Sequence, residues 1–183
     1  GYAEAQLRLA LMYEVGRGVP KNAPTALKLF ALAAEQGVAL AQYNMAVAFE
    51  TGKGAPKDLT LAFEWYRQAA EQGHAQAQYN LGIFYKRGDG IPKNELIAIK
   101  WLNLAAEQGN ASAQLNIGLM YEDGKGVEEN GKIALHWYTL AAKQGHAQAQ
   151  TNLGFMYEDG SGIAKDRERA YMWYNLSAIN GNK

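Results

Sequence analysis

Residues 73–108 read GHAQAQYNLGIFYKRGDGIPKNELIAIKWLNLAAEQ, and this 36-residue pattern returns along the whole chain. The same step separates the tryptophans Trp65, Trp101, Trp137 and Trp173 and the glycines Gly37, Gly73, Gly109, Gly145 and Gly181. A fixed step of this size is typical of a stack of one supersecondary unit, in which each copy buries its apolar face against its neighbours. We therefore expect function on the surface of the stack rather than in one cluster of reactive side chains.

Each unit is predicted to be a helical hairpin. Over residues 75–85, apolar side chains recur with the one-face spacing of an amphipathic helix, at Ala77, Leu81, Phe84 and Tyr85. Gly88 is suited to the left-handed conformation just past a helix C-terminus. Asn94 is suited to cap a second helix, which ends before Gly109. The cap position repeats as Asn22, Asp58, Asn94, Asn130 and Asp166, so the sequence predicts an all-α chain of five helix-turn-helix repeats.

The four recurring tryptophans are interpreted as part of the core between repeats rather than as a cage for a ligand. Alanines such as Ala69 and Ala105 allow close approach of helices, while the four tryptophans are expected to fill space between units. A buried tryptophan removes roughly 200 Å² from water. On this interpretation Trp101 is a main source of stability.

The overall composition excludes several classes of partner. Lys plus Arg and Asp plus Glu both number 18, which does not favour nucleic acid. No apolar run approaches the ~20 residues of a membrane span. Cysteine is absent, and no HExxH, paired CxxC or phosphate-binding GxxxxGK[ST] motif occurs. We therefore expect no metal, no cofactor and no enzymatic activity.

The motif resembles the Sel1-like repeat, a relative of the tetratricopeptide repeat. The likeness is carried by the residues GHAQAQYNLG at 73–82, by Gly88-Asp89-Gly90, and by Asn94, Ala98, Trp101 and 105–108. It covers the whole chain as one array over 1–183, with repeats 1–36, 37–72, 73–108, 109–144 and 145–180. The resemblance implies an α/α right-handed superhelical solenoid that serves as an adaptor for proteins or peptides. It also suggests a bacterial protein that is periplasmic, surface-bound or secreted.

The chain opens inside the repeat motif, and Gly181-Asn182 copies Gly109-Asn110. We therefore expect a fragment of a longer protein, in which a further unit follows.

The side of helix 75–85 opposite its core residues is the candidate binding surface. By likeness to tetratricopeptide arrays, this side of each repeat lines a concave groove. The candidate residues are Asn44, Asn80, Asn116, Asn152, Gln76, Tyr79, Ile83, Arg87, Leu119 and Phe155. An asparagine amide both donates and accepts, which suits a peptide backbone. Alternatively, these amides bond the backbone of the next repeat and only stiffen the stack. Arg8 and Arg87 against Asp123 and Asp159 suggest a groove that is basic toward one end and acidic toward the other.

Two other functions are alternatives to the scaffold. Binding or hydrolysis of a β-lactam or peptidoglycan fragment is suggested for cysteine-rich Sel1-like relatives, but this chain lacks cysteine and an SxxK motif. Nucleic-acid binding would need a continuous basic stripe, which the groove positions do not provide.

Overall fold

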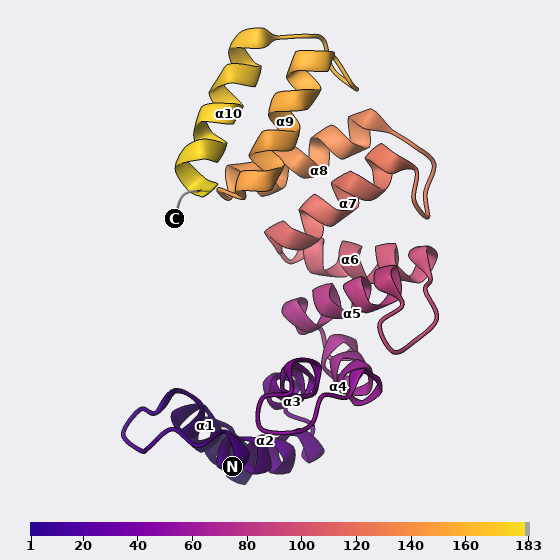
Figure 1. Ribbon diagram of the computed structural model, residues 1–183. Coiled ribbons are helices and arrows are strands. Elements are labelled where there is room, and N and C mark those ends of the chain that lie inside the picture. The colour runs from indigo at the N-terminus through magenta and orange to yellow at the C-terminus, as the bar shows by residue number, and fades with distance from the viewer. Residues whose placement is uncertain (182–183) are drawn as a thin grey trace. The chain divides into compact units, whose positions relative to one another are not determined.

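The computed structural model describes residues 1–181, which form ten helices (Figure 1). The helices are α1 Tyr2–Val15, α2 Ala23–Glu35, α3 Ala39–Thr51, α4 Leu59–Glu71, α5 Ala75–Arg87, α6 Glu95–Glu107, α7 Ala111–Asp123, α8 Gly131–Lys143, α9 Ala147–Asp159 and α10 Arg167–Gly181. Each repeat contributes two of them, which confirms the predicted all-α array of helical hairpins. Within the described residues, no helix has the length and apolarity needed to cross a bilayer.

The predicted caps determine where the helices begin and end. The side chains of Asn22, Asp58, Asn94, Asn130 and Asp166 each accept a hydrogen bond from a backbone N–H in the first turn of the following helix. Gly88 ends α5 with a φ of 83°, a left-handed conformation that favours glycine. The equivalent glycines Gly16, Gly52, Gly124 and Gly160 also have positive φ, so the same chain reversal explains them.

The chain divides into two compact units, Gly1–Lys93 and Asn94–Lys183. Consecutive helices contact each other from α1 to α5 in the first unit and from α6 to α10 in the second (Figure 1). The continuous array over 1–183 and its right-handed superhelical curvature stay predictions. Asn182, on which the expected further unit was based, lies outside the described residues.

The core depends less on tryptophan than the sequence suggested. The alanines Ala33, Ala69, Ala105 and Ala141 are fully buried, as expected. Trp65 and Trp173, however, pack at the margin of the core and keep partial exposure. The residue that follows the tryptophan is the deeper one, since Tyr66 and Tyr138 are 0% exposed. Adjacent helical positions differ by about 100° in direction, so only one of the two can point straight between helices.

Tyr66 shows how the repeats interlock within the first unit. Its ring packs edge-on against Phe84 of α5, with 5.4 Å between the ring centroids. Its hydroxyl donates a hydrogen bond to Glu50 of α3. One side chain of α4 therefore contacts the first helix of its own repeat and that of the next.

A ladder of buried glutamines satisfies the ends of the second helices. Gln42, Gln78, Gln114 and Gln150 are at most 5% exposed. Each donates to a carbonyl near the end of the preceding helix, on Ala34, Ala70, Ala106 and Ala142 respectively. The side-chain oxygens of Gln42, Gln114 and Gln150 accept from Gln72, Gln144 and Asn180. The same carbonyls also accept backbone N–H groups of the following glycines, so each glutamine adds a second, side-chain hydrogen bond at a helix end.

We expect Gln150→Ala to lower the free energy of unfolding by about 1–3 kcal/mol, because it removes two hydrogen bonds of a buried side chain, one to the Ala142 carbonyl and one from the Asn180 amide. Gln148→Ala is the matched control, since Gln148 lies on the same helix but is exposed. The control should change stability by no more than about 0.5 kcal/mol. Urea denaturation of both variants measures the difference, and equal effects would contradict a structural role for the glutamine ladder.

Candidate peptide-binding face

We define the first-helix face as the solvent-accessible side of the first helix of each repeat, comprising α1, α3 and α5 in the first unit and α7 and α9 in the second. All ten predicted binding residues lie on these helices, and none of them is buried. Arg87 and Phe155 are exposed, and the other eight are partly exposed. Their accessibility agrees with a binding role, which stays a prediction.

Four of the predicted residues lie together around one hollow. Tyr79, Asn80, Ile83 and Arg87 of α5 line a space of about 160 Å³ with Phe84 and with Glu50 of α3. Glu50, whose helix belongs to the preceding repeat, was not among the predicted residues. The hollow therefore lies between the first helices of two consecutive repeats.

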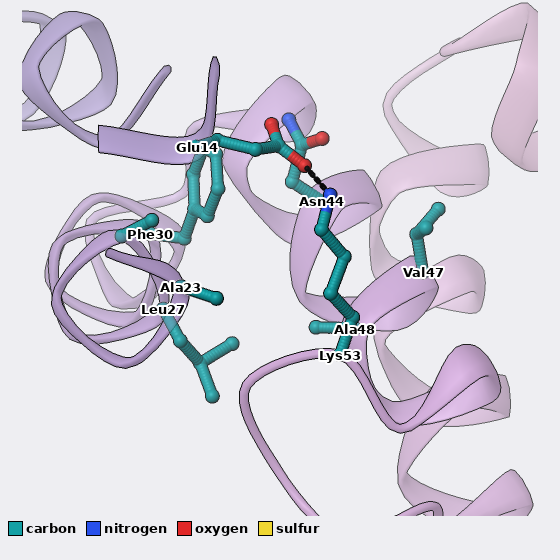
Figure 2. A pocket seen from close by; sticks show the side chains of 9 residues that line it. Glu14, Ala23, Leu27, Phe30, Asn44, Val47, Ala48 and Lys53 are labelled. Carbon is teal, nitrogen blue, oxygen red and sulfur yellow. Dashed lines mark hydrogen bonds and ion pairs between the residues drawn. The ribbon is translucent and has the colours of Figure 1, made fainter. Parts of the chain in front are cut away.

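Equivalent hollows occur one repeat apart in the first unit. The hollow between α1, α2 and α3 is lined by Glu14, Ala23, Ala26, Leu27, Phe30, Asn44, Val47, Ala48 and Lys53 (Figure 2). A third hollow of about 240 Å³ is lined by Arg8, Leu11, Met12, Val15 and Arg17 of α1 and its following loop. Arg8, Asn44 and Asn80 share one position of the 36-residue pattern, as do Leu11, Val47 and Ile83. Each hollow thus presents a polar side chain beside an aliphatic one.

The four candidate asparagines, Asn44, Asn80, Asn116 and Asn152, differ in their hydrogen-bond partners. Asn44 and Asn116 donate to carbonyls of their own helices, on Leu40 at 2.8 Å and Ser112 at 2.9 Å. Asn80 instead accepts from Gln76 at 3.2 Å and lies near the Tyr66 hydroxyl.

Asn152 repeats the second arrangement, because it accepts from Gln148 at 3.1 Å and lies near the Tyr138 hydroxyl. The hydrogen bonds of Asn80 and Asn152 therefore go to glutamines of their own helices, and among the described residues none goes to the backbone of the next repeat, in contrast to what the structural alternative assumed.

The tyrosines near these asparagines form hydrogen-bonded pairs with glutamates. These pairs were not predicted from the sequence. The hydroxyls of Tyr66, Tyr138 and Tyr174 donate to Glu50, Glu122 and Glu158 respectively. Burial, and then the hydrogen bond to the glutamate, raise the pKa of Tyr66 and Tyr138 well above the ordinary value. The same causes raise the pKa of Tyr174 to about 12. In the first repeat, Phe30 stands at the tyrosine position, and Glu14 pairs with Lys53 at 3.0 Å instead.

These tyrosines predict a loss of stability at alkaline pH. Their pKa is raised in the folded protein, so the folded chain keeps protons that the unfolded chain releases near pH 10. Their contribution is complete below about pH 10 and is lost as the pH rises further. We expect the double variant Tyr66→Phe/Tyr138→Phe to show a shallower fall of melting temperature between about pH 8 and pH 11 than the original chain. Parallel melting curves would contradict this explanation.

The charges on the face are locally compensated. Arg8 pairs with Glu4 at 3.1 Å, and Lys125 pairs with Asp123 at 2.7 Å. Arg87 lies 3.9 Å from Asp89. All of these side chains have substantial exposure, so the pairs contribute little to stability. The expected charge difference between the two ends of the groove stays a prediction.

One histidine, His74, has structural surroundings. His74 caps α5 by accepting from the Ala77 N–H and stacks on Tyr43, with 4.8 Å between the ring centroids. Burial lowers its pKa. In the part of the chain that the structure describes, no group of three or more His, Asp or Glu side chains could hold a metal ion.

Comparisons with known proteins agree with the repeat architecture. A sequence model described as the Sel1 repeat matches residues 3–38, 39–74, 75–110, 111–146 and 147–182. Each segment begins two residues after the start of the corresponding repeat that the recurring glycines predicted, for example at residue 75 rather than 73. No curated protein matches the sequence significantly.

Several solved structures are similar. A Sel1 repeat protein from Oxalobacter formigenes shares 41% sequence identity with a TM-score of 0.93, over 99% of this chain and 74% of the other. A protective antigen present in uropathogenic Escherichia coli strains, with an SLR fold, shares 36% identity with a TM-score of 0.95. That match covers 100% of this chain but only 39% of the antigen. An immunity protein from Pseudomonas aeruginosa has 24% identity and a TM-score of 0.58, over 99% of this chain and 66% of the other, which shows a common fold alone.

Proposed function

This chain belongs to the Sel1 repeat family, and we propose that it is a non-catalytic interaction scaffold that binds an extended peptide or protein segment on the first-helix face. The observation that carries the proposal is the series of hollows in the first unit, which recur at equivalent positions of successive repeats. A partner that is itself repetitive along its length, as an extended peptide is, can contact such a series.

The chemistry of the hollows suits a peptide. Val47 and Ile83 offer apolar surface for side chains, while Asn44 and Asn80 lie beside them in the same hollows. The Asn44 amide donates to Leu40, and among the described residues no donor contacts its side-chain oxygen. That oxygen is therefore available to accept a backbone N–H of a partner.

The absence of cysteine from the chain allows a direct blocking experiment. A single cysteine is introduced at Ile83, inside a hollow, or at Leu32 on α2, which is 47% exposed. Each variant is coupled to a bulky maleimide, and both are tested against peptides selected from a displayed random library on the unlabelled original chain.

We expect the label at position 83 to abolish binding and the label at position 32 to leave it intact. Equal loss, or retention of binding by both labelled proteins, would place the peptide elsewhere and refute the proposed function.

A further inference from the structure

We propose that the hollow between α3 and α5 binds one lysine side chain of the partner, with the lysine ammonium group on the carboxylate of Glu50. This inference rests on the proposed function, because it assigns the chemistry of one position along the first-helix face.

The preceding hollow shows how a lysine occupies the equivalent place. Lys53, just past the end of α3, lies 3.0 Å from Glu14 of α1, and both side chains line the hollow between α1, α2 and α3 (Figure 2). The space that remains there is about 20 Å³. A single water molecule needs roughly 10–15 Å³ of such space. That hollow therefore has no room for a side chain of a partner.

The next hollow keeps the carboxylate but lacks the lysine. Glu50 and Asp89 stand one 36-residue step after Glu14 and Lys53 respectively. The space beside Glu50 is about 160 Å³. Among the described residues, no lysine or arginine forms an ion pair with Glu50. This hollow thus holds a carboxylate without a cation and has room for a side chain.

The lining suits both the head and the stem of a lysine. The buried Tyr66 hydroxyl donates to the Oε2 atom of Glu50, and no donor of the described residues contacts the Oε1 atom. That oxygen can accept from an ammonium group, which donates hydrogen bonds and accepts none. Tyr79 and Ile83 line the same hollow, where the methylene stem of a lysine can lie against their apolar surface.

The neighbouring charges also favour a cation. Arg87 is 67% exposed at the rim and lies 3.9 Å from Asp89. Two carboxylates therefore stand against one guanidinium group around the hollow, which leaves a net negative charge. An acidic side chain would be repelled by Glu50, and an uncharged one would leave that carboxylate without a counter-ion.

Two substitutions test the pocket. Glu50→Gln removes the charge but keeps an oxygen that can accept from Tyr66. Asp89→Lys restores the lysine of the preceding hollow, and the fold should tolerate it because Lys53 and Lys125 stand at this position in other repeats. Glu35→Gln, at an exposed residue near the end of α2, is the matched control. Thermal melting checks that all three variants fold.

The probes are end-blocked pentapeptides of alanine with lysine, norleucine or glutamate at the centre, together with longer peptides selected by display. Norleucine has the stem of lysine without the ammonium group, so the comparison isolates the charge. NMR titrations follow the side-chain amide of Asn80 and the methyl groups of Ile83, both of which line the hollow.

We expect the original chain and Glu35→Gln to bind the lysine peptide about fivefold more tightly than the norleucine peptide. High salt should reduce this preference, because it screens the ion pair. Glu50→Gln and Asp89→Lys should each abolish the preference, the second because the chain's own lysine competes for Glu50.

Two results would contradict the inference. If the peptides perturb Asn80 and Ile83 but the preference for lysine is absent, or survives either Glu50→Gln or Asp89→Lys, the lysine pocket is refuted and the proposed function stands. If neither the pentapeptides nor the selected peptides perturb the first-helix face, both are refuted.

Discussion

Tyr66→Ala should lower the free energy of unfolding by about 3–5 kcal/mol, the cost typical of truncating a buried aromatic side chain. Tyr66 is 0% exposed, packs on Phe84 and bonds Glu50, so its loss leaves a cavity between α3, α4 and α5. Because neighbouring repeats stabilise one another, part of this loss extends to the adjacent repeats.

Two further variants separate the stability contributed by the Tyr66 ring from that of its hydroxyl and of Trp65. Trp65→Ala should cost less than Tyr66→Ala, because Trp65 lies at the margin of the core with partial exposure. Tyr66→Phe keeps the ring and removes only the hydroxyl bonds, at about 0.5–1.5 kcal/mol. Urea and thermal unfolding followed by circular dichroism measure all three. If Trp65→Ala were the most damaging, the core would be organised around the tryptophans, as the sequence alone suggested.

The second large effect concerns binding. The double variant Val47→Lys/Ile83→Lys should weaken binding of display-selected peptides about a hundredfold or more. Each substitution replaces an apolar contact worth about 1.5–3 kcal/mol, and about 1.4 kcal/mol corresponds to a factor of ten. Both side chains are partly exposed, so the fold should persist.

Leu32→Lys is the matched control for this experiment, because it makes the same chemical change at an exposed aliphatic residue of a second helix. It should leave the dissociation constant unchanged. Titration calorimetry on both proteins gives the comparison, and equal affinities would contradict the assignment of binding to the first-helix face.

The sequence predicted the repeat architecture well because that architecture depends on local signals. The 36-residue step, the cap residues such as Asn94 and the left-handed glycines such as Gly88 act over a few neighbouring residues. These signals determine where helices begin, end and reverse. They also place the ten candidate residues on one side of their helices.

The sequence-based prediction of the core was wrong where contacts between helices decide which side chain is buried. Helical periodicity places Trp65 and Tyr66 only about 100° apart, and it does not show which of them enters between repeats. A usable signal was the joint recurrence of the glutamate and the tyrosine, as in Glu50 with Tyr66 and Glu122 with Tyr138. Where Leu102 replaces the tyrosine, Lys86 stands at the glutamate position.

The sequence also did not show which side-chain amides hydrogen-bond the backbone. The invariant glutamines, such as Gln42 and Gln78, proved to be the amides that bond the main chain of the preceding helix. The asparagines differ among themselves because their bonds depend on the side chain opposite. Asn80 lies near the Tyr66 hydroxyl, whereas Asn44 shares its hollow with Phe30, which has no hydroxyl.

The most direct test of the scaffold proposal is an NMR titration of the isotope-labelled chain with a display-selected peptide. We predict that the largest shifts fall on the first-helix face, at the side-chain amides of Asn44 and Asn80 and the methyls of Val47 and Ile83. Signals from exposed second-helix residues such as Leu32 and Leu104 should stay in place. Shifts concentrated on the second helices, with Asn44 and Ile83 unperturbed, would contradict the account.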